Sequence, residues 1–326
     1  MAAKKFDFIT IGGATRDITF YDDRGEFIAT PQDLTRQKIL GFEYGAKINI
    51  EKTYTTFGGG AANAAVNLAN LGFKVAAAVA VGNDDNGRAI ITHFKKRKVV
   101  TDLVEINPNL ATGFSFLLTA GRENEHIAFL YRGANNSLNL SVKSLAAIRT
   151  ARWLYVTSLS GHNWSAVLDK VCQHCHQLAW NPGGTQLHGG YPKLKKYLAK
   201  TTVLILNKDE AVELVLSSKQ VNKKQINNVK YLLKQIKSWG VNIILITSGR
   251  RGADSYDGQK FYHIDPYNLR KKVFDTTGVG DCFGSTFVAG LERTGGNIGL
   301  ALKASARNAA AVTEKIGAQN GFKKVI

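Results

Sequence analysis

The chain has 326 residues, 44% of them hydrophobic, and its 43 Lys and Arg outnumber its 25 Asp and Glu to give a net charge of +18. That apolar content supports a folded core of one large α/β domain or two smaller ones, and it argues against a disordered chain. The basic residues fall in separate small groups, so the charge predicts a solvated surface that attracts anionic small molecules, with nucleic-acid binding the less favoured interpretation.

The cysteines and the N-terminal segment bear on the protein's location. Cys172, Cys175 and Cys282 are too few for a disulfide framework and fit a reducing compartment; Cys172 and Cys175 have the spacing of half a zinc site, but no second pair exists. The N-terminus shows no signal peptide, and the longest purely apolar run, residues 75–81, is too short to cross a bilayer. We therefore expect a soluble, cytoplasmic protein with no membrane partner.

Short apolar runs alternate with helical periodicity from about Lys74 onward, which is the pattern of βαβ units around a parallel sheet. Ligands of open α/β sheets bind at the carboxyl ends of the strands, and polar or glycine residues follow several of these runs. The sequence therefore predicts one ligand cleft, although each polar segment alone also fits a helix cap. The expected strands are residues 6–11, 75–81, 153–156, 178–180, 203–206 and 243–246.

Two segments, residues 18–57 and 112–131, interrupt this rhythm. Each holds two strand-like stretches and a turn, at residues 22–25 and 121–124, and each resembles a β-hairpin. We expect the two segments to pair into one small sheet that covers the cleft as a lid. Their apolar character also favours a homodimer formed through the lid.

Three successive glycines, Gly58 to Gly60, precede an alanine-rich helix that is expected to end at Gly72. Glycines let the backbone approach a ligand closely, and Asn63 in the first helical turn can donate hydrogen bonds to hydroxyl groups and accept them. The segment favours a polyhydroxylated ligand, although a plain tight turn also explains a glycine run before a helix.

Two further polar segments follow expected strands. Thr247 and Gly249 belong to a loop whose amides and neighbouring arginines can hold a polyphosphate. Glu210 can hold Mg²⁺ through water molecules, because that ion retains much of its hydration shell. Asn207 and Glu210 equally fit the N-cap and capping box of a surface helix, so this segment stays open.

Residues 275–286 are the most informative stretch, because they place Asp281 behind a glycine turn and at the start of an expected helix. A helix that begins near Gly280 leaves the amides of Gly278 to Asp281 unsatisfied, and a phosphate can sit at the positive end of its dipole. Asp281 can then accept the proton of an attacking hydroxyl, which predicts phosphoryl transfer. Walker A, Rossmann and protein-kinase motifs are absent from the sequence.

Residues 58–63 and 275–281, in this order and at this separation, resemble the two signatures of the ribokinase-like, or PfkB, carbohydrate and nucleoside kinases, and the resemblance extends over nearly the whole chain. It implies a three-layer α/β/α sandwich with a mostly parallel central sheet and a small β-sheet lid, in a single domain of residues 1–326. It also implies ATP as the phosphate donor, Mg²⁺, and often a monovalent cation such as K⁺.

The resemblance carries roles over by position. It implies that Asp281 is the catalytic base and that the anion hole consists of Gly278, Val279 and Gly280. The implied substrate contacts are Asp17, Gly59 and Asn63. The implied nucleotide contacts are Asn207, Thr247, Gly249 and Asn308. The implied metal sites use Glu210 for Mg²⁺ and Asp275 with Thr277 for the monovalent cation, with further ligands near Gly317 and Ala318.

The chain departs from ribokinases proper at Gly60 and Ala61, where a lysine is usual, so ribose itself is not implied. The expected activity is ATP-dependent phosphorylation of an alcohol group on a sugar or a nucleoside. A phosphosugar kinase of the same family is one alternative. A non-catalytic, nucleic-acid-associated protein built on the same fold is the other.

Overall fold

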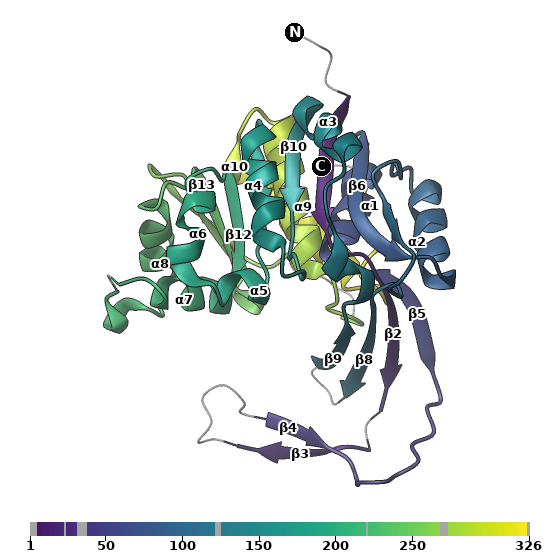
Figure 1. Ribbon diagram of the computed structural model, residues 1–326. Helices are drawn as coiled ribbons and strands as arrows, with labels where there is room; N and C mark the ends of the chain where they lie inside the picture. Colours follow the sequence, from purple (N-terminus) through teal and green to yellow (C-terminus); the bar gives the residue numbers. More distant parts are fainter. Residues whose placement is uncertain are drawn as a thin grey trace.

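The computed structural model describes residues 5–22, 24–30, 38–120, 125–219, 221–267 and 273–324. Its central sheet has nine strands in the order β15-β14-β13-β12-β11-β10-β1-β6-β7, and the seven from β13 to β7 are parallel, as expected (Figure 1). All six strands expected from the sequence lie in this sheet. Its members are β1 (Phe6–Gly12), β6 (Val75–Gly82), β7 (Glu105–Asn107), β10 (Ala151–Val156), β11 (Leu178–Trp180), β12 (Val203–Asn207), β13 (Ile243–Thr247), and the antiparallel β14 (Ala253–Tyr256) and β15 (Phe261–Ile264).

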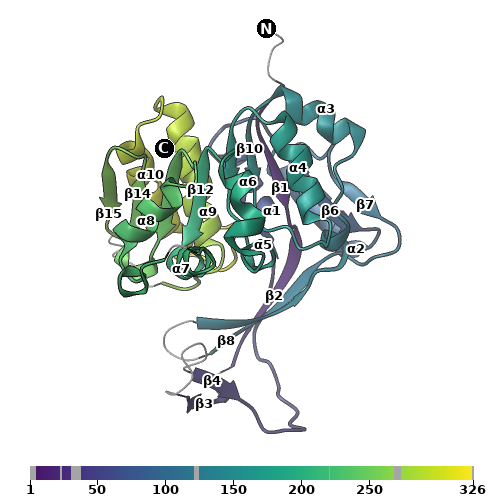
Figure 2. The ribbon, with the colours of Figure 1, turned by 60° about the vertical axis from the view of Figure 1, so that its left-hand side comes forward.

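Helices cover both faces of the sheet, which makes the three-layer sandwich (Figures 1 and 2). One layer holds α1 (Gly60–Asn70), α2 (Asp85–Lys96), α9 (Val279–Arg293) and α10 (Ile298–Val312). The other layer holds α3 (Val142–Thr150), α4 (Trp164–His174), α5 (Gly184–Leu187), α6 (Gly190–Leu198), α7 (Lys208–Leu216) and α8 (Val229–Lys237). Short 3₁₀ turns lie at η1 (Gly133–Ser137), η2 (Lys223–Gln225) and η3 (Gly249–Arg251).

The strand sequences are apolar on both faces because both faces are buried. Successive side chains of a strand point to opposite faces, so Trp153 and Tyr155 of β10 pack toward α1 and α9, whereas Leu154 and Val156 pack toward the layer of α3 to α8. This double burial accounts for the near-continuous apolar runs from which the parallel sheet is predicted.

The two segments that interrupt the α/β rhythm do join into one small sheet, with the order β5-β2-β8-β9, below the central sheet in Figure 1. Its strands are β2 (Thr15–Tyr21), β5 (Thr53–Gly58), β8 (Phe114–Ala120) and β9 (Glu125–Tyr131). The parallel pairing of β2 with β8 joins the two segments, and it sets Asp17 opposite Ser115. The turn expected at residues 121–124 lies outside the described residues.

The first lid segment is more than the predicted hairpin. Between β2 and β5 the chain forms a separate two-stranded ribbon, β3 (Glu26–Ala29) with β4 (Lys38–Gly41), which extends away from the four-stranded sheet (Figures 1 and 2). The carboxylate of Asp22 accepts hydrogen bonds from the backbone and guanidinium of Arg24, and Arg24 also donates to the Asn49 carbonyl at 2.6 Å. These bonds tie the start of the excursion to its return, a long-range contact that local strand patterns do not reveal.

Among the described residues, no helix combines the length and the apolar character that a bilayer-spanning segment needs. Cys172, Cys175 and Cys282 are free thiols, and burial raises the pKa of Cys172 to about 12.

Candidate active site

The start of α9 presents Asp281 in its first turn, three residues after the N-cap Gly278, which no other residue can replace without a shift. Gly278 has φ 74°, and a Cβ atom there would lie 2.4 Å from the Ala318 side chain. The left-handed glycine therefore turns the chain sharply into α9, against the segment that contains Ala318. This geometry places Asp281 where the positive end of the helix dipole acts.

The amides at this helix start are only partly free. The Val279 amide donates to the Thr276 carbonyl at 3.3 Å, so the prediction that all amides from Gly278 to Asp281 are unsatisfied is wrong for Val279. Within the described part of the chain, the amides of Gly278, Gly280 and Asp281 have no recorded hydrogen-bond partner. Three donors thus remain for an anion at the mouth of the helix.

Asp281 sits among groups that raise its basicity. Burial is the main reason why the pKa of its carboxyl is raised, the charge of Asp17 raises it further, and a hydrogen bond from Asn63 opposes the rise. The Asn63 amide nitrogen donates to Asp281 Oδ2 at 2.7 Å. A Cβ atom on Gly60 would lie 3.3 Å from Asp281 Oδ1, so the glycine backbone approaches the carboxylate closely.

Asp17 lies on the lid strand β2, and its side chain is 5% exposed. Burial is also the main cause of its raised pKa; hydrogen bonds from Thr15 and Ser115 oppose the rise, and the charge of Asp275 adds to it. Thr15 Oγ1 donates to Asp17 at 2.9 Å. The carboxylate lies flat against Gly58, where an added Cβ atom would meet Asp17 Oδ2 at 1.8 Å.

Gly59 and Asn63 belong to the start of α1. Gly59 is the N-cap with φ 91°, and a Cβ atom there would lie 2.5 Å from the carbonyl oxygen of Gly13. Asn63 is 4% exposed and follows in the first turn. Of the three residues expected to contact substrate, Asn63 bonds Asp281 directly and Asp17 lies near enough for its charge to raise the pKa of Asp281, while Gly59 precedes Gly60, whose backbone approaches Asp281.

Two residues that the sequence analysis missed continue from Asn63. Gln319 donates from Nε2 to Asn63 Oδ1 at 3.0 Å, and His93 Nε2 lies 2.8 Å from Gln319 Oε1. The His93 ring stacks on Phe57, with ring centroids 3.9 Å apart. Gln319 directly follows Ala318, so the expected closeness of Gly317 and Ala318 to the site was the one sequence signal that pointed toward it.

Asn207 and Thr247 are direct register partners at the carboxyl ends of β12 and β13. Asn207 caps α7: its side chain accepts from the Glu210 amide, and the Glu210 carboxylate accepts from the Asn207 amide, each at 2.8 Å. The capping-box interpretation is thus confirmed. Capping leaves a further role open for Glu210. Burial raises the pKa of this carboxyl, and the charge of Asp281 raises it further, so the two carboxylates interact electrostatically.

Gly249 begins η3, and Ser248 separates it from the strand that ends at Thr247. Its φ is 55°, and a Cβ atom there would meet nothing within 4 Å, so this backbone is open to a ligand. The Ser248 amide donates to the Gly252 carbonyl at 2.8 Å and closes the loop.

Asp275 is 7% exposed and ties two segments together. Its Oδ1 accepts from the Thr277 amide and its Oδ2 from the Gly317 amide, each at 2.8 Å. The expected neighbourhood of Asp275, Thr277 and Gly317 is therefore present, and no ion pair to Asp275 is recorded among the described residues.

Asn308 stands apart from the other expected site residues. It is 2% exposed within α10 and donates to Asn67 Oδ1 at 3.0 Å and to Thr286 Oγ1 at 2.8 Å. Its Oδ1 accepts from the Lys323 amide at 2.7 Å. Both amide protons are thus engaged within the protein, which makes a packing role the first explanation of this side chain.

Asn308→Ala should lower the free energy of unfolding by about 1–3 kcal/mol, because Asn67 Oδ1 and the Lys323 amide lose the hydrogen-bond partner that Asn308 provides. Urea unfolding of the variant measures the loss. Asn109→Ala, at an exposed position, is the matched control and should be near neutral. Equal unfolding midpoints for both variants would contradict the role given to Asn308.

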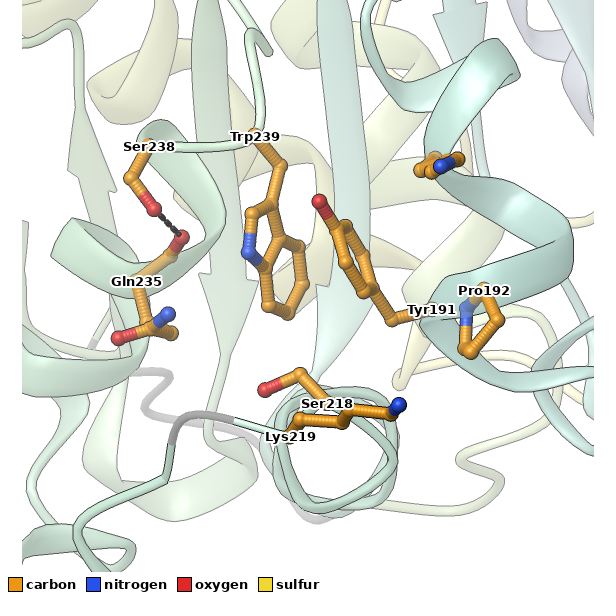
Figure 3. Close-up of a pocket in the computed structure, with 8 residues that line it drawn as sticks. Tyr191, Pro192, Ser218, Lys219, Gln235, Ser238 and Trp239 are labelled. Carbon is orange, nitrogen blue, oxygen red and sulfur yellow. Dashed lines mark hydrogen bonds between the residues drawn. The ribbon is translucent and has the colours of Figure 1, made fainter.

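Cavity size does not locate this site. A cavity of about 490 Å³ lies among α6, α7 and α8, where the rings of Tyr191 and Trp239 lie 4.4 Å apart by centroid (Figure 3). None of the expected site residues lines it. A smaller cavity of about 220 Å³, lined in part by Phe57, His93 and Gln319, lies beside the residues that contact Asn63. The convergence of carboxylates and glycines at Asp281 is therefore the better guide to the chemistry.

The fold and this convergence match a known family. Residues 27–325 fit the model of the pfkB family of carbohydrate kinases, so the chain belongs to that family and is a kinase. It is 27% identical over 276 residues to the ribokinase of Bacillus subtilis, a match that covers 82% of this chain and 85% of the relative. It is 23% identical over 290 residues to the ATP-dependent 6-phosphofructokinase of Thermoanaerobacterium thermosaccharolyticum, covering 84% of each.

Solved structures agree on the fold. The ribokinase of Arabidopsis thaliana, solved with ribose and ATP, superposes with a TM-score of 0.78 at 20% identity, covering 97% of this chain and 95% of the other. The expected ribokinase-like sandwich with a β-sheet lid is confirmed. Because the chain is a kinase, the non-catalytic, nucleic-acid-associated alternative is not supported.

Proposed function

We propose that this protein is a cytoplasmic, single-domain enzyme that transfers the γ-phosphoryl group of ATP to an alcohol group of a sugar or a nucleoside. The observation that carries the proposal is Asp281, a desolvated carboxylate in the first turn of α9 with free amides around it. A base needs contact with the hydroxyl it deprotonates, and phosphoryl transfer otherwise depends on positioning and electrostatics.

The acceptor alcohol would bind between the lid and α1. Asp17 accepts hydrogen bonds from hydroxyl groups, and Asn63 can both donate and accept them. Gly59 allows the backbone to approach the acceptor without a side chain in the way. The charge of Asp17 raises the pKa of the Asp281 carboxyl, which supports their lying on one acceptor site.

The migrating phosphoryl group would lie at the anion hole of Gly278, Val279 and Gly280. Preorganised backbone amides stabilise the charge on the transferring group without reorganisation at the moment of reaction. The amides of Gly278 and Gly280 carry most of this role, because the Val279 amide already donates to Thr276.

The nucleotide would lie along the adjoining sheet edge. Asn207 and Thr247 are neighbours there, and Gly249 provides open backbone beside them. Asn308 would support the nucleotide site indirectly, by holding α10 against α1 and α9 through its buried hydrogen bonds.

Glu210 fits an outer-sphere magnesium site. Its charge lies in reach of Asp281 and, among the described residues, has no recorded ion pair, so a bound cation would relieve the repulsion between the two carboxylates. When bound, Mg²⁺ would supply neutralisation of charge on the phosphates. The residues' own part is to hold the hydrated ion's water molecules at Glu210.

Glu210→Gln should raise the Mg²⁺ concentration that gives half-maximal activity by about 10- to 100-fold, the usual cost of losing an outer-shell partner. Glutamine also completes a capping box, so α7 should persist. Glu213→Gln, on the same helix, is the control. An unchanged Mg²⁺ requirement in Glu210→Gln would remove Glu210 from the site.

Asp275 and Thr277 fit a monovalent-cation site. The Asp275 carboxylate is buried, and only two backbone amides are recorded as its partners among the described residues. A buried carboxylate that has no recorded ion pair in the described part of the chain could have its negative charge balanced by a bound K⁺.

We also propose a homodimer formed through the lid. Phe129, Leu130 and Tyr131 of β9 are 57%, 50% and 43% exposed, a large apolar surface for one short strand. Phe129→Glu should convert the dimer to monomer in light scattering, whereas Val142→Glu, which adds the same charge at an 86% exposed position on α3, should not. A wild-type monomer would refute the proposal.

ATP consumption with a panel of acceptors tests the proposed function. Pentoses, hexoses and nucleosides represent the favoured class. Sugar phosphates represent the alternative of a phosphosugar kinase, which the similarity to a 6-phosphofructokinase favours. Acceptor-dependent ADP release with at least one of these compounds supports the proposal, and none with any of them would refute it.

A further inference from the structure

We propose that His93 and Gln319 are positioning residues for the phosphoryl transfer: His93 bonds Gln319, Gln319 bonds Asn63, and Asn63 is thereby oriented to donate to the carboxylate of the base Asp281 and to keep it ionised. This inference rests on the proposed function. It concerns a chain of four side chains, Asp281, Asn63, Gln319 and His93, which we call the relay. Successive members lie 2.7, 3.0 and 2.8 Å apart.

The direction of every hydrogen bond in the relay follows from the charge of its first member. An ionised Asp281 only accepts, so Asn63 must turn its amide nitrogen toward Asp281. The Asn63 oxygen then faces Gln319 and requires the Gln319 nitrogen as donor. The Gln319 oxygen is left to face His93, which must therefore carry a proton on Nε2.

His93 is held so that it can always supply that proton. Its ring stacks on Phe57, and the guanidinium of Arg16 lies 4.3 Å from the centre of the same Phe57 ring. Burial lowers the pKa of His93, and the charges of Arg97 and Arg16 lower it further, against the bond to Gln319. A neutral His93 ring that carries its proton on Nε2 donates to Gln319, and so does a doubly protonated ring. The direction of the hydrogen bonds in the relay therefore does not depend on the charge of His93.

The hydrogen bond from Asn63 matters because the other ionisable groups recorded around Asp281 are acids, and a negative charge nearby disfavours the ionised form of Asp281. Asp17 from β2 and Glu210 from α7 are acidic, and Tyr155 from β10 and Cys282 are buried acids whose pKa values Asp281 helps to raise. Asn63 is the one side chain recorded as donating to the Asp281 carboxylate among the described residues. An Asn63 amide turned the other way would present its oxygen to the carboxylate and force Asp281 to hold a proton.

Gln319→Glu keeps the size of the side chain but should reverse the direction of its hydrogen bond with Asn63. An ionised glutamate accepts from His93 but cannot donate to the Asn63 oxygen, so Asn63 should turn its nitrogen toward residue 319. Asp281 then loses its donor, and the pKa of its carboxyl should rise. A hydrogen bond to a charged group is worth enough to shift that pKa by about one to two pH units.

The test compares pH profiles of kcat/KM for the acceptor in wild type, Gln319→Glu and Gln319→Met. The acidic limb should move to higher pH by about one to two units in Gln319→Glu, while the KM for ATP and the Tm stay near wild type. Gln319→Met removes both hydrogen bonds and should lower kcat by about tenfold. An unshifted limb in a folded Gln319→Glu enzyme would overturn the proposal.

Variants of His93 provide a second, independent test of the relay. His93→Phe keeps a ring on Phe57 but removes the donor, whereas His93→Gln restores a donor without the ring. Activity should fall in the first variant and be largely recovered in the second. His176→Phe, at an exposed position, is the control. Equal losses in His93→Phe and His93→Gln would indicate packing alone and would contradict the relay.

A carboxyl titration separates this inference from the proposed function. In protein with ¹³C-labelled aspartate carboxyls, the signal that Asp281→Asn removes reports the protonation of Asp281 without any substrate. A higher pKa for this signal in Gln319→Met, which adds no charge that would itself raise it, than in wild type supports the relay even if every tested acceptor fails. An equal or lower pKa overturns it even if the enzyme is an active kinase.

Discussion

Asp281→Asn should reduce kcat for the acceptor by roughly 10²- to 10⁴-fold, the usual scale for a positioned general base. The amide keeps the size of the side chain and can still accept the hydrogen bond that Asn63 donates at 2.7 Å, so the loop at the start of α9 should keep its shape. Only the capacity to take a proton is lost. Steady-state kinetics with the acceptor found in the panel measures the effect.

Nucleotide affinity is the internal control for this substitution. Titration calorimetry with ADP should give nearly the same Kd in wild type and variant, because Asn207, Thr247 and Gly249 are untouched. A variant with full turnover would remove Asp281 from the mechanism. A variant that also loses ADP would show that Asp281 serves the shape of the nucleotide site instead.

Gly58→Ala should lower kcat/KM for the acceptor by about 10- to 100-fold, the cost of losing one or two hydrogen bonds to a charged group. The added Cβ atom would lie 1.8 Å from Asp17 Oδ2 and 2.6 Å from Asp17 Cγ, so the carboxylate must leave its place against the lid strand. The change is one methyl group, and its effect should be specific: the KM for ATP should stay within about twofold, the scale of remote substitutions.

A double-mutant cycle isolates the cause. If Gly58→Ala acts through Asp17, then adding it to Asp17→Ala should cost little more, and the two losses should be strongly non-additive. Gly299→Ala in α10 is the matched control, because its Cβ atom would make only an ordinary contact, 3.5 Å from Asn297. Additive losses would mean that Gly58 matters for a reason other than Asp17.

Much of the fold could be predicted from the sequence because its signals are local. Strands buried on both faces give continuous apolar runs, and β6 and β10 fall where such runs predict them. The left-handed turn at Gly278 is similarly local, since only glycine adopts φ 74° without strain. Asn207 and Glu210 show the limit of such signals, because one pattern predicts both the capping box, which the structure contains, and a metal role, which it leaves to experiment.

The rest could not be predicted because it depends on contacts between distant segments. Gln319 reaches Asn63 across 256 residues and His93 meets Gln319 across 226, and no local pattern connects them. At the β3–β4 ribbon, the bond from Arg24 to the Asn49 carbonyl joins residues that lie 25 positions apart in the sequence. The burial of Asn308 depends on how α10 packs against α1 and α9.

A crystal structure with the acceptor alcohol and a non-hydrolysable ATP analogue tests the assignment of Asp281 most directly. We expect the acceptor hydroxyl at about 2.6–3.2 Å from the Asp281 carboxylate, the reach of a general base, with the terminal phosphate on the free amides at the start of α9. An acceptor hydroxyl that lies out of reach of Asp281, or a phosphate bound away from Gly278 and Gly280, would contradict it.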